Sequence, residues 1–147
     1  MKTGFLWHER YAWHNTGRGS GPYHADASAW NEPDVRHSEN ADGKRRFRNL
    51  LDVTGLLDQL VALTPRPATV EEVCRFHTPD YVERIAALSA MHGGDADMNV
   101  GEGVPFGKGS YEVALLAAGG TITLCDAIMD GTVANGYALT RPPGHHA

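Results

Sequence analysis

Two adjacent histidines, His145 and His146, are the residues whose type and setting point most directly to chemistry. They follow a Pro142-Pro143-Gly144 turn, in which each proline fixes its own φ and the glycine permits a sharp or close-packed conformation. Histidine titrates near neutral pH, so a pair of imidazoles can take a proton from water and protonate or stabilise a leaving group. The sequence therefore predicts a hydrolytic site directly after this turn, with two incidental histidines on a polar loop as the alternative.

The other candidate patterns are weaker. The run His8-Glu9-Arg10-Tyr11-Ala12 begins like the helical zinc-protease motif, but Ala12 stands where the second histidine is required. The glycine-rich stretch 93–109 lacks the phosphate-loop pattern, and Asp97 and Glu102 within it are typical of solvated carboxylates. The remaining histidines have no metal-ligand spacing, so we expect them at the surface or in satisfied core positions.

The composition is typical of a soluble globular domain, and it excludes several classes of protein. The formal net charge of −5 disfavours a nucleic-acid-binding surface. Cys74 and Cys125 are far apart, which argues against a disulfide framework and favours a reducing compartment. We find no apolar run of signal-peptide or membrane-spanning length. The sequence thus predicts a cytoplasmic protein with neither nucleic acid nor a membrane as partner, and it leaves a homo-oligomer open.

The first half of the chain begins with a predicted short strand over residues 5–7, followed by an irregular segment over residues 14–43. Apolar residues at helical spacing then predict a long helix over residues 44–63, which Gly55 weakens. The spacing of Thr69 and Glu72 matches a capping box and predicts a short helix. Thr78-Pro79 predicts the start of another helix, whose buried face consists of Tyr81, Ile85 and Leu88.

The second half contains a predicted loop over residues 92–109 and then a helix that Ser110 caps and that runs to about Asp130. The pair Gly119-Gly120 inside this helix predicts close packing against another backbone. A short buried strand follows over residues 136–140. This order of strands and helices predicts an open α/β sheet, in which ligands bind beyond the carboxyl ends of the strands.

Along nearly its whole length, the sequence resembles the histone deacetylase superfamily, and within it the bacterial amidohydrolase branch that is similar to class II deacetylases. The resemblance is carried by Tyr11-Ala12-Trp13-His14-Asn15-Thr16-Gly17, Lys44-Arg45-Arg46-Phe47, Gly109-Ser110-Tyr111-Glu112, Ala117-Ala118-Gly119-Gly120, Gly136-Tyr137-Ala138-Leu139 and Arg141-Pro142-Pro143-Gly144-His145-His146-Ala147. The last of these is the most specific, because the family carries its tandem catalytic histidines there.

This resemblance implies that residues 1–147 are the N-terminal part of a single deacetylase domain with an arginase-like parallel sheet and flanking helices. It implies zinc-dependent hydrolysis of an acetyl-amide, with an acetylated lysine peptide or an acetylpolyamine as substrate. His146 would act as the general base for the zinc-activated water, and His145 would supply electrostatic or acid help to the leaving amine.

The resemblance also implies roles for residues away from the histidine pair. Glu102 would be the acidic rim residue that holds the substrate backbone, with Asp97 as the alternative. Arg45 would line the internal channel behind the metal, and Pro143 and Gly144 would border it.

The chain departs from the family pattern because it contains no Asp-x-His sequence. The family's zinc ligands and its oxyanion-stabilising tyrosine lie downstream of the histidine pair, so no metal ligand is assigned here. We expect these 147 residues alone to be inactive and to be aggregation-prone or only partly folded, because an inner strand would lack its neighbours. The alternatives are a noncatalytic relic or interaction module that retains the first half of the fold, and an unrelated metal-binding module.

Overall fold

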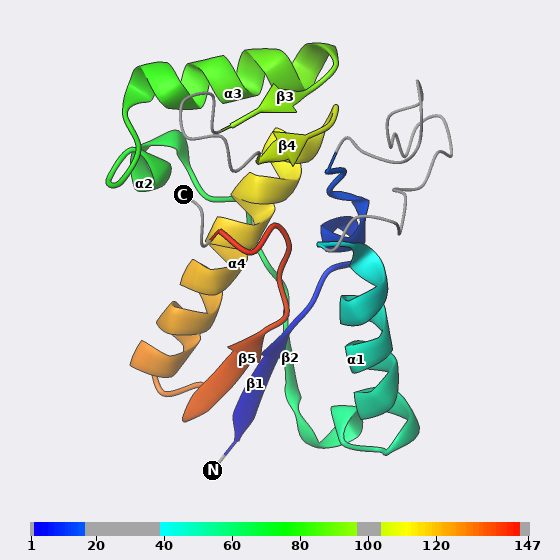
Figure 1. The fold of residues 1–147 in the computed structure, drawn as a ribbon. Coiled ribbons are helices and arrows are strands. Elements are labelled where there is room, and N and C mark those ends of the chain that lie inside the picture. The colour runs from blue at the N-terminus through cyan, green and yellow to red at the C-terminus, as the bar shows by residue number, and fades with distance from the viewer. Residues whose placement is uncertain (1, 17–38, 97–103, 145–147) are drawn as a thin grey trace.

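The computed structural model describes residues 2–16, 39–96 and 104–144. At its centre lies a parallel sheet in the order β2-β1-β5 (Figure 1). Strand β1 (Thr3–Leu6) pairs with β2 (Val61–Leu63) along one edge and with β5 (Asn135–Ala138) along the other. The predicted open α/β sheet is therefore confirmed, with a parallel arrangement.

Two helices lie on either side of this sheet, α1 (Ala41–Val53) and α4 (Ser110–Met129) (Figure 1). Successive residues of a strand point to opposite faces. Gly136 of β5 contacts Leu124 of α4, whereas the next residue, Tyr137, stacks on Phe47 of α1. One face of β5 therefore packs against α4 and the other against α1, and the carboxyl end of the strand lies between these two helices (Figure 1).

The core gathers where α4 crosses β1 and the 3-10 helix η1 (Glu9–Trp13). Its buried residues are Leu6, Tyr11, Val113, Leu116, Ala117, Leu124, Ala127 and Val133. The predicted close packing at Gly119-Gly120 is confirmed, because a Cβ atom on Gly119 would collide with the backbone at Arg66 and Ala68. A Cβ atom on Gly120 would collide with the Tyr11 hydroxyl.

By length and composition, α4 is apolar enough to cross a membrane, contrary to the prediction that no run approaches that length. Its packing explains that composition differently, because Val113, Leu116 and Leu124 lie in the core cluster. An apolar helix of this length is also what a buried core position requires.

The predicted helix over residues 44–63 is wrong in its second half. Helix α1 ends at Val53, and Gly55 adopts a φ of +71°, the left-handed conformation that favours glycine and ends a helix. A short 3-10 helix, η3 (Leu57–Gln59), leads into β2, where pairing with β1 replaces helical hydrogen bonds. Tertiary pairing thus overrides the local apolar period.

The helices that follow match their predicted start signals. The capping box of α2 (Val70–Val73) is present, with both the Thr69 and the Glu72 side chains bonded to backbone. Thr78 caps α3 (Pro79–Met91) as predicted. The predicted inner face of α3 is only half-buried, whereas Val82 and Ser89 are fully buried, so the helix is rotated relative to the prediction.

Three other predictions need correction. The 92–109 segment is not only loop, because β3 (Gly94–Asp95) pairs antiparallel with β4 (Pro105–Phe106). Gly109 rather than Ser110 is the N-cap of α4, since its φ of +78° turns the chain into the helix. Strand β5 is largely exposed rather than buried, because within the described residues it has a partner strand on one edge only.

Candidate functional site

Four of the predicted site residues, Asp97, Glu102, His145 and His146, lie outside the described residues. The structure instead describes the segment that leads to the histidine pair. After β5, the amide of Leu139 donates to the Leu6 carbonyl at 2.9 Å, which extends the pairing with β1 beyond the strand. The chain then turns through residues 141–144 at the carboxyl end of β5 (Figure 1).

This turn borders a cavity of about 790 Å³, a size typical of a small-molecule site. Pro142, Pro143 and Gly144 line one side of it. The first half of α4, the α2–α3 segment and strand β4 supply the other walls, including Val73, Tyr81, Ile85, Phe106, Tyr111, Leu115 and Ala118. The cavity therefore lies at the carboxyl ends of the strands, where open α/β folds bind ligands, and Gly144, which precedes His145 in the sequence, is part of its wall.

Two histidines that sequence reasoning assigned no function also line this cavity. The Nδ1 atom of His14 lies 3.2 Å from the Ser110 hydroxyl, and both residues are buried. His77 stacks on Tyr81 with ring centroids 4.9 Å apart. Only the fold shows that these two side chains line a cavity, because their spacing in the sequence matches no ligand or catalytic pattern.

Arg45, predicted to line a channel, lies on α1 and does not border the cavity. Its guanidinium donates to the Glu9 carboxylate, with the Nη2–Oε1 distance at 2.7 Å. The channel role of Arg45 stays a prediction, and its observed contact ties α1 to η1.

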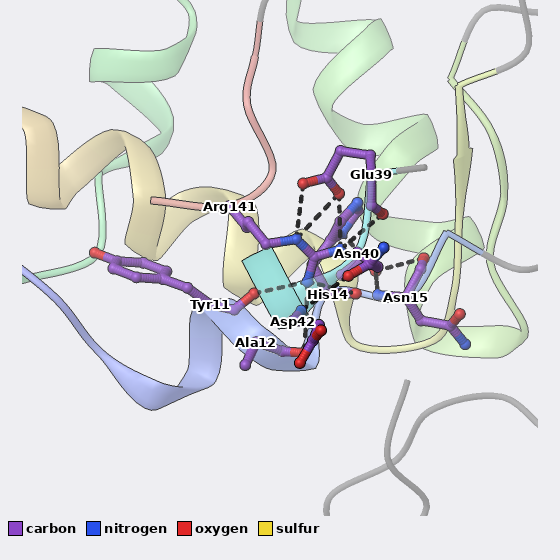
Figure 2. Close-up of polar contacts among 9 residues, drawn as sticks. Tyr11, Ala12, His14, Asn15, Glu39, Asn40, Asp42 and Arg141 are labelled. Carbon is purple, nitrogen blue, oxygen red and sulfur yellow. Dashed lines mark hydrogen bonds and ion pairs between the residues drawn. The ribbon is translucent and has the colours of Figure 1, made fainter. Parts of the chain in front are cut away.

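A different arginine, Arg141, is buried at the base of the turn with 1% of its side chain exposed. Figure 2 shows its guanidinium facing Glu39 and the backbone of residues 11–14. The carboxylate of Glu39 accepts from both Nε and Nη2 of Arg141, at 2.8 and 2.7 Å. Sequence reasoning placed Arg141 only at the start of the Arg141–Ala147 motif and gave it no role, and no local pattern links it to a partner 102 residues away.

The same guanidinium also donates to backbone carbonyls. Nη1 donates to the carbonyls of Tyr11, Ala12 and His14 at 3.1, 3.4 and 3.1 Å, and Nη2 donates to that of Glu39 at 3.2 Å. Arg141 therefore joins the turn to the end of η1 and to the residue just before the N-cap of α1.

The side chain of Tyr11, whose carbonyl bonds to Arg141, carries its phenol hydroxyl into the apolar core. Burial raises the pKa of its phenol to about 12 from the ordinary 10.0, because the charged form would lose its hydration. Its hydroxyl donates to the Leu116 carbonyl at 3.1 Å. Tyr11 thus stays neutral and fixes η1 against α4 while its own carbonyl accepts from Arg141.

Metal binding requires several ligand side chains around one point. Within residues 2–16, 39–96 and 104–144, no three His, Cys, Asp or Glu side chains lie close enough to hold a metal ion. A catalytic zinc site needs about three protein ligands and an open position. The described residues therefore do not fit a zinc ion by themselves.

The comparisons with known proteins are consistent with this geometry. Residues 37–147 match the model of the histone deacetylase domain. The chain is 39% identical to the histone deacetylase-like amidohydrolase of Pseudomonas aeruginosa over 99% of its length, and it spans 37% of that protein. It is 32% identical to the human polyamine deacetylase HDAC10 over 84% of its length, which spans 19% of that protein.

A solved structure gives the same result for the fold. The crystal structure of the HDA15 HD domain superposes with a TM-score of 0.79 at 26% identity, covering 99% of this chain and 37% of that one. The chain thus spans little more than a third of the Pseudomonas amidohydrolase and of the HDA15 domain, and about a fifth of HDAC10.

Proposed function

This chain belongs to the histone deacetylase family, and we propose that it is the N-terminal part of a zinc-dependent deacetylase that hydrolyses an acetyl-amide. One observation carries the proposal: the Pro142–Gly144 turn lines a cavity at the carboxyl end of β5, and the two histidines follow that turn directly. The proposed substrate is an acetylated lysine or an acetylated polyamine, since relatives are named for histone and for polyamine deacetylation.

In the proposed reaction His146 takes a proton from the attacking water, and His145 stabilises or protonates the leaving amine. Zinc, when bound, would polarise the amide carbonyl and acidify its water. We assign no zinc ligand to the described residues, because they contain no cluster of three His, Cys, Asp or Glu side chains. Asp97 or Glu102 holds the substrate at the rim in this proposal, and Pro143 and Gly144 border the channel.

The proposal includes a cytoplasmic location and no nucleic-acid or membrane partner. The net charge of −5 supports the absence of a nucleic-acid partner, because a chain with net negative charge repels a polyanion. A homo-oligomer is compatible with the proposal.

The test uses the full protein that contains this chain, an acetyl-lysine peptide and an acetylated polyamine. We expect chelator to abolish deacetylation, and His146→Ala to lower kcat by about 10² to 10⁴-fold, the usual contribution of a general base. His92→Ala is the matched control, because His92 is exposed at the end of α3 and does not line the cavity.

Activity that survives both chelator and His146→Ala would refute the mechanism. A folded full protein that hydrolyses neither substrate would favour the noncatalytic interaction module instead.

A further inference from the structure

Arg141 has no part in the proposed reaction, yet it has the most extensively bonded buried charge among the described side chains. A buried guanidinium is tolerated only when its donors are paired. Here both edges of the group are occupied, one by the Glu39 carboxylate and the other by carbonyls at the end of η1 (Figure 2). A planar fork with fixed donor directions holds such partners in one relative position.

The chain between this anchor and the histidine pair is short and stiff. Only Pro142, Pro143 and Gly144 separate Arg141 from His145. Both prolines have a fixed φ, so few soft dihedral angles remain to absorb a displacement of Arg141. A shift of the guanidinium would therefore be transmitted to the residues that follow the turn.

Two of the residues that Arg141 contacts, Glu39 and His14, also belong to the cavity wall. Glu39 and His14 line the cavity on one side, and Pro142 to Gly144 line another. One guanidinium thus joins two parts of the cavity lining, although they are more than 100 residues apart in the sequence.

We propose that Arg141, paired with Glu39, is a positioning residue for the histidine pair: it fixes the Pro142–Gly144 turn against residues 11–14 and so determines where His145 and His146 begin. This inference rests on the proposed deacetylase function for its effect on rate. The anchoring itself does not depend on that function and is measured separately.

The kinetic test compares Arg141→Met, Arg141→Lys and Glu39→Gln in the full protein, with kcat normalised to the folded fraction from near-UV circular dichroism. We expect kcat to fall about 100-fold in Arg141→Met with KM within about threefold, because misplacing a catalytic group by 1 Å has an effect of this size. Arg141→Lys retains the charge but loses the fork, so we expect it to lower kcat about tenfold.

Arg66→Met is the matched control. Arg66 makes an equally short bidentate pair with Glu72, but this pair lies at the α2 cap and outside the cavity lining. We expect its kcat and KM to equal those of the wild type. If Arg141→Met does not fold, Glu39→Gln takes its place, with the same expectation of a lower kcat and an unchanged KM.

Hydrogen exchange tests the anchor without any substrate. We expect the amides of Leu139, Thr140, Arg141 and Gly144 to exchange faster in Arg141→Met and Arg141→Lys, while those of α3 are unchanged. Unchanged exchange at these amides would overturn the anchor, and faster exchange with a normal kcat would overturn its role in positioning. An inactive wild type would refute the proposed function alone, and exchange would still decide the anchor.

Discussion

Two arginine–glutamate pairs in this chain have nearly the same geometry in very different surroundings. The Arg141–Glu39 and Arg66–Glu72 pairs have Nη2–carboxylate distances of 2.7 and 2.6 Å. The Arg141 side chain is 1% exposed and its partner is 102 residues away, whereas Arg66 is 43% exposed and its partner is six residues away. The first pair joins distant segments at the cavity, and the second one reinforces a local helix start.

This difference shows why the length of an ion pair does not measure its contribution. Water reaches the Arg66–Glu72 pair through the arginine, whose side chain is 43% exposed, so it screens the pair and solvates Arg66 when Glu72 is removed. Water does not reach the guanidinium of Arg141, and without it the carbonyls and the carboxylate around it would lose their donor. Variants of the two pairs test this contrast, and a variant of Tyr11 tests the burial of the region around Arg141.

The largest expected effect is on stability in Arg141→Met. Removing one partner of a buried ion pair lowers the free energy of unfolding by about 3–5 kcal/mol. We expect a loss of about 3 kcal/mol here, because Glu39 keeps partial access to water. Chemical denaturation of the full protein measures it. Arg66→Met should leave the free energy of unfolding close to that of the wild type, and equal losses in the two variants would remove the contrast.

The second prediction concerns the coupling within each pair. A double-mutant cycle of Arg141→Met with Glu39→Gln should give an interaction energy of about 1–2 kcal/mol, as contacting residues in one network do. The corresponding cycle of Arg66→Met with Glu72→Gln should give a value several-fold smaller, because the Arg66 side chain is 43% exposed and its charge is screened by water. Similar values from the two cycles would mean that burial does not distinguish the pairs.

The two regions also differ in how far the sequence could predict them. The surroundings of Arg66–Glu72 follow from local spacing, since a threonine three residues before a glutamate already specifies the capping box. The Arg141–Glu39 pair depends on chain topology, which brings the end of β5 beside the segment before α1. Single-sequence patterns carry no information on such a pairing.

The same division applies to the rest of the fold. The close packing at Gly119-Gly120 was predictable, because a glycine pair inside an apolar helix signals the approach of another backbone. Strand β2 was not, since its three residues continue a helical apolar period and become a strand only by pairing with β1. At the site, the turn and its histidines were visible in the sequence, whereas the cavity and its His14 and His77 walls required the fold.

The third prediction tests the apolar side of the buried region through Tyr11→Phe. Loss of the hydroxyl bond to Leu116 should destabilise the protein by about 1 kcal/mol at neutral pH. The folded-state pKa of Tyr11 is raised from 10.0 to about 12, so the unfolded chain releases this proton first. Its contribution is complete below pH 10 and is lost as the pH rises toward about 12.

The free energies of unfolding of the wild type and Tyr11→Phe should therefore converge within this alkaline window and then cross, because only the wild type has to keep a buried phenol protonated. Tyr137→Phe serves as the control, because that ring is 53% exposed on β5. A constant difference between the wild type and Tyr11→Phe up to pH 12 would contradict the burial of this phenol.

The smallest expected effect belongs to the exposed pair and appears as a titration. The hydrogen bond from Arg66, followed by the Thr69 amide, lowers the pKa of Glu72 to about 2 from the ordinary 4.5. Because the folded-state pKa is depressed, the contribution of Glu72 is present above pH 4.5 and is lost as the pH falls toward about 2.

In Arg66→Met, carboxyl resonances followed by NMR should show that the pKa of Glu72 rises only part of the way toward its ordinary 4.5. The Thr69 amide still donates to this carboxylate and keeps the pKa low. Arg75→Met should raise it less, since Arg75 acts on Glu72 only through charge and is the weaker of the two arginines. Equal shifts in the two variants would show that general charge, rather than the bidentate contact, sets this titration. The exposed pair would then differ from Arg141–Glu39 in kind as well as in burial.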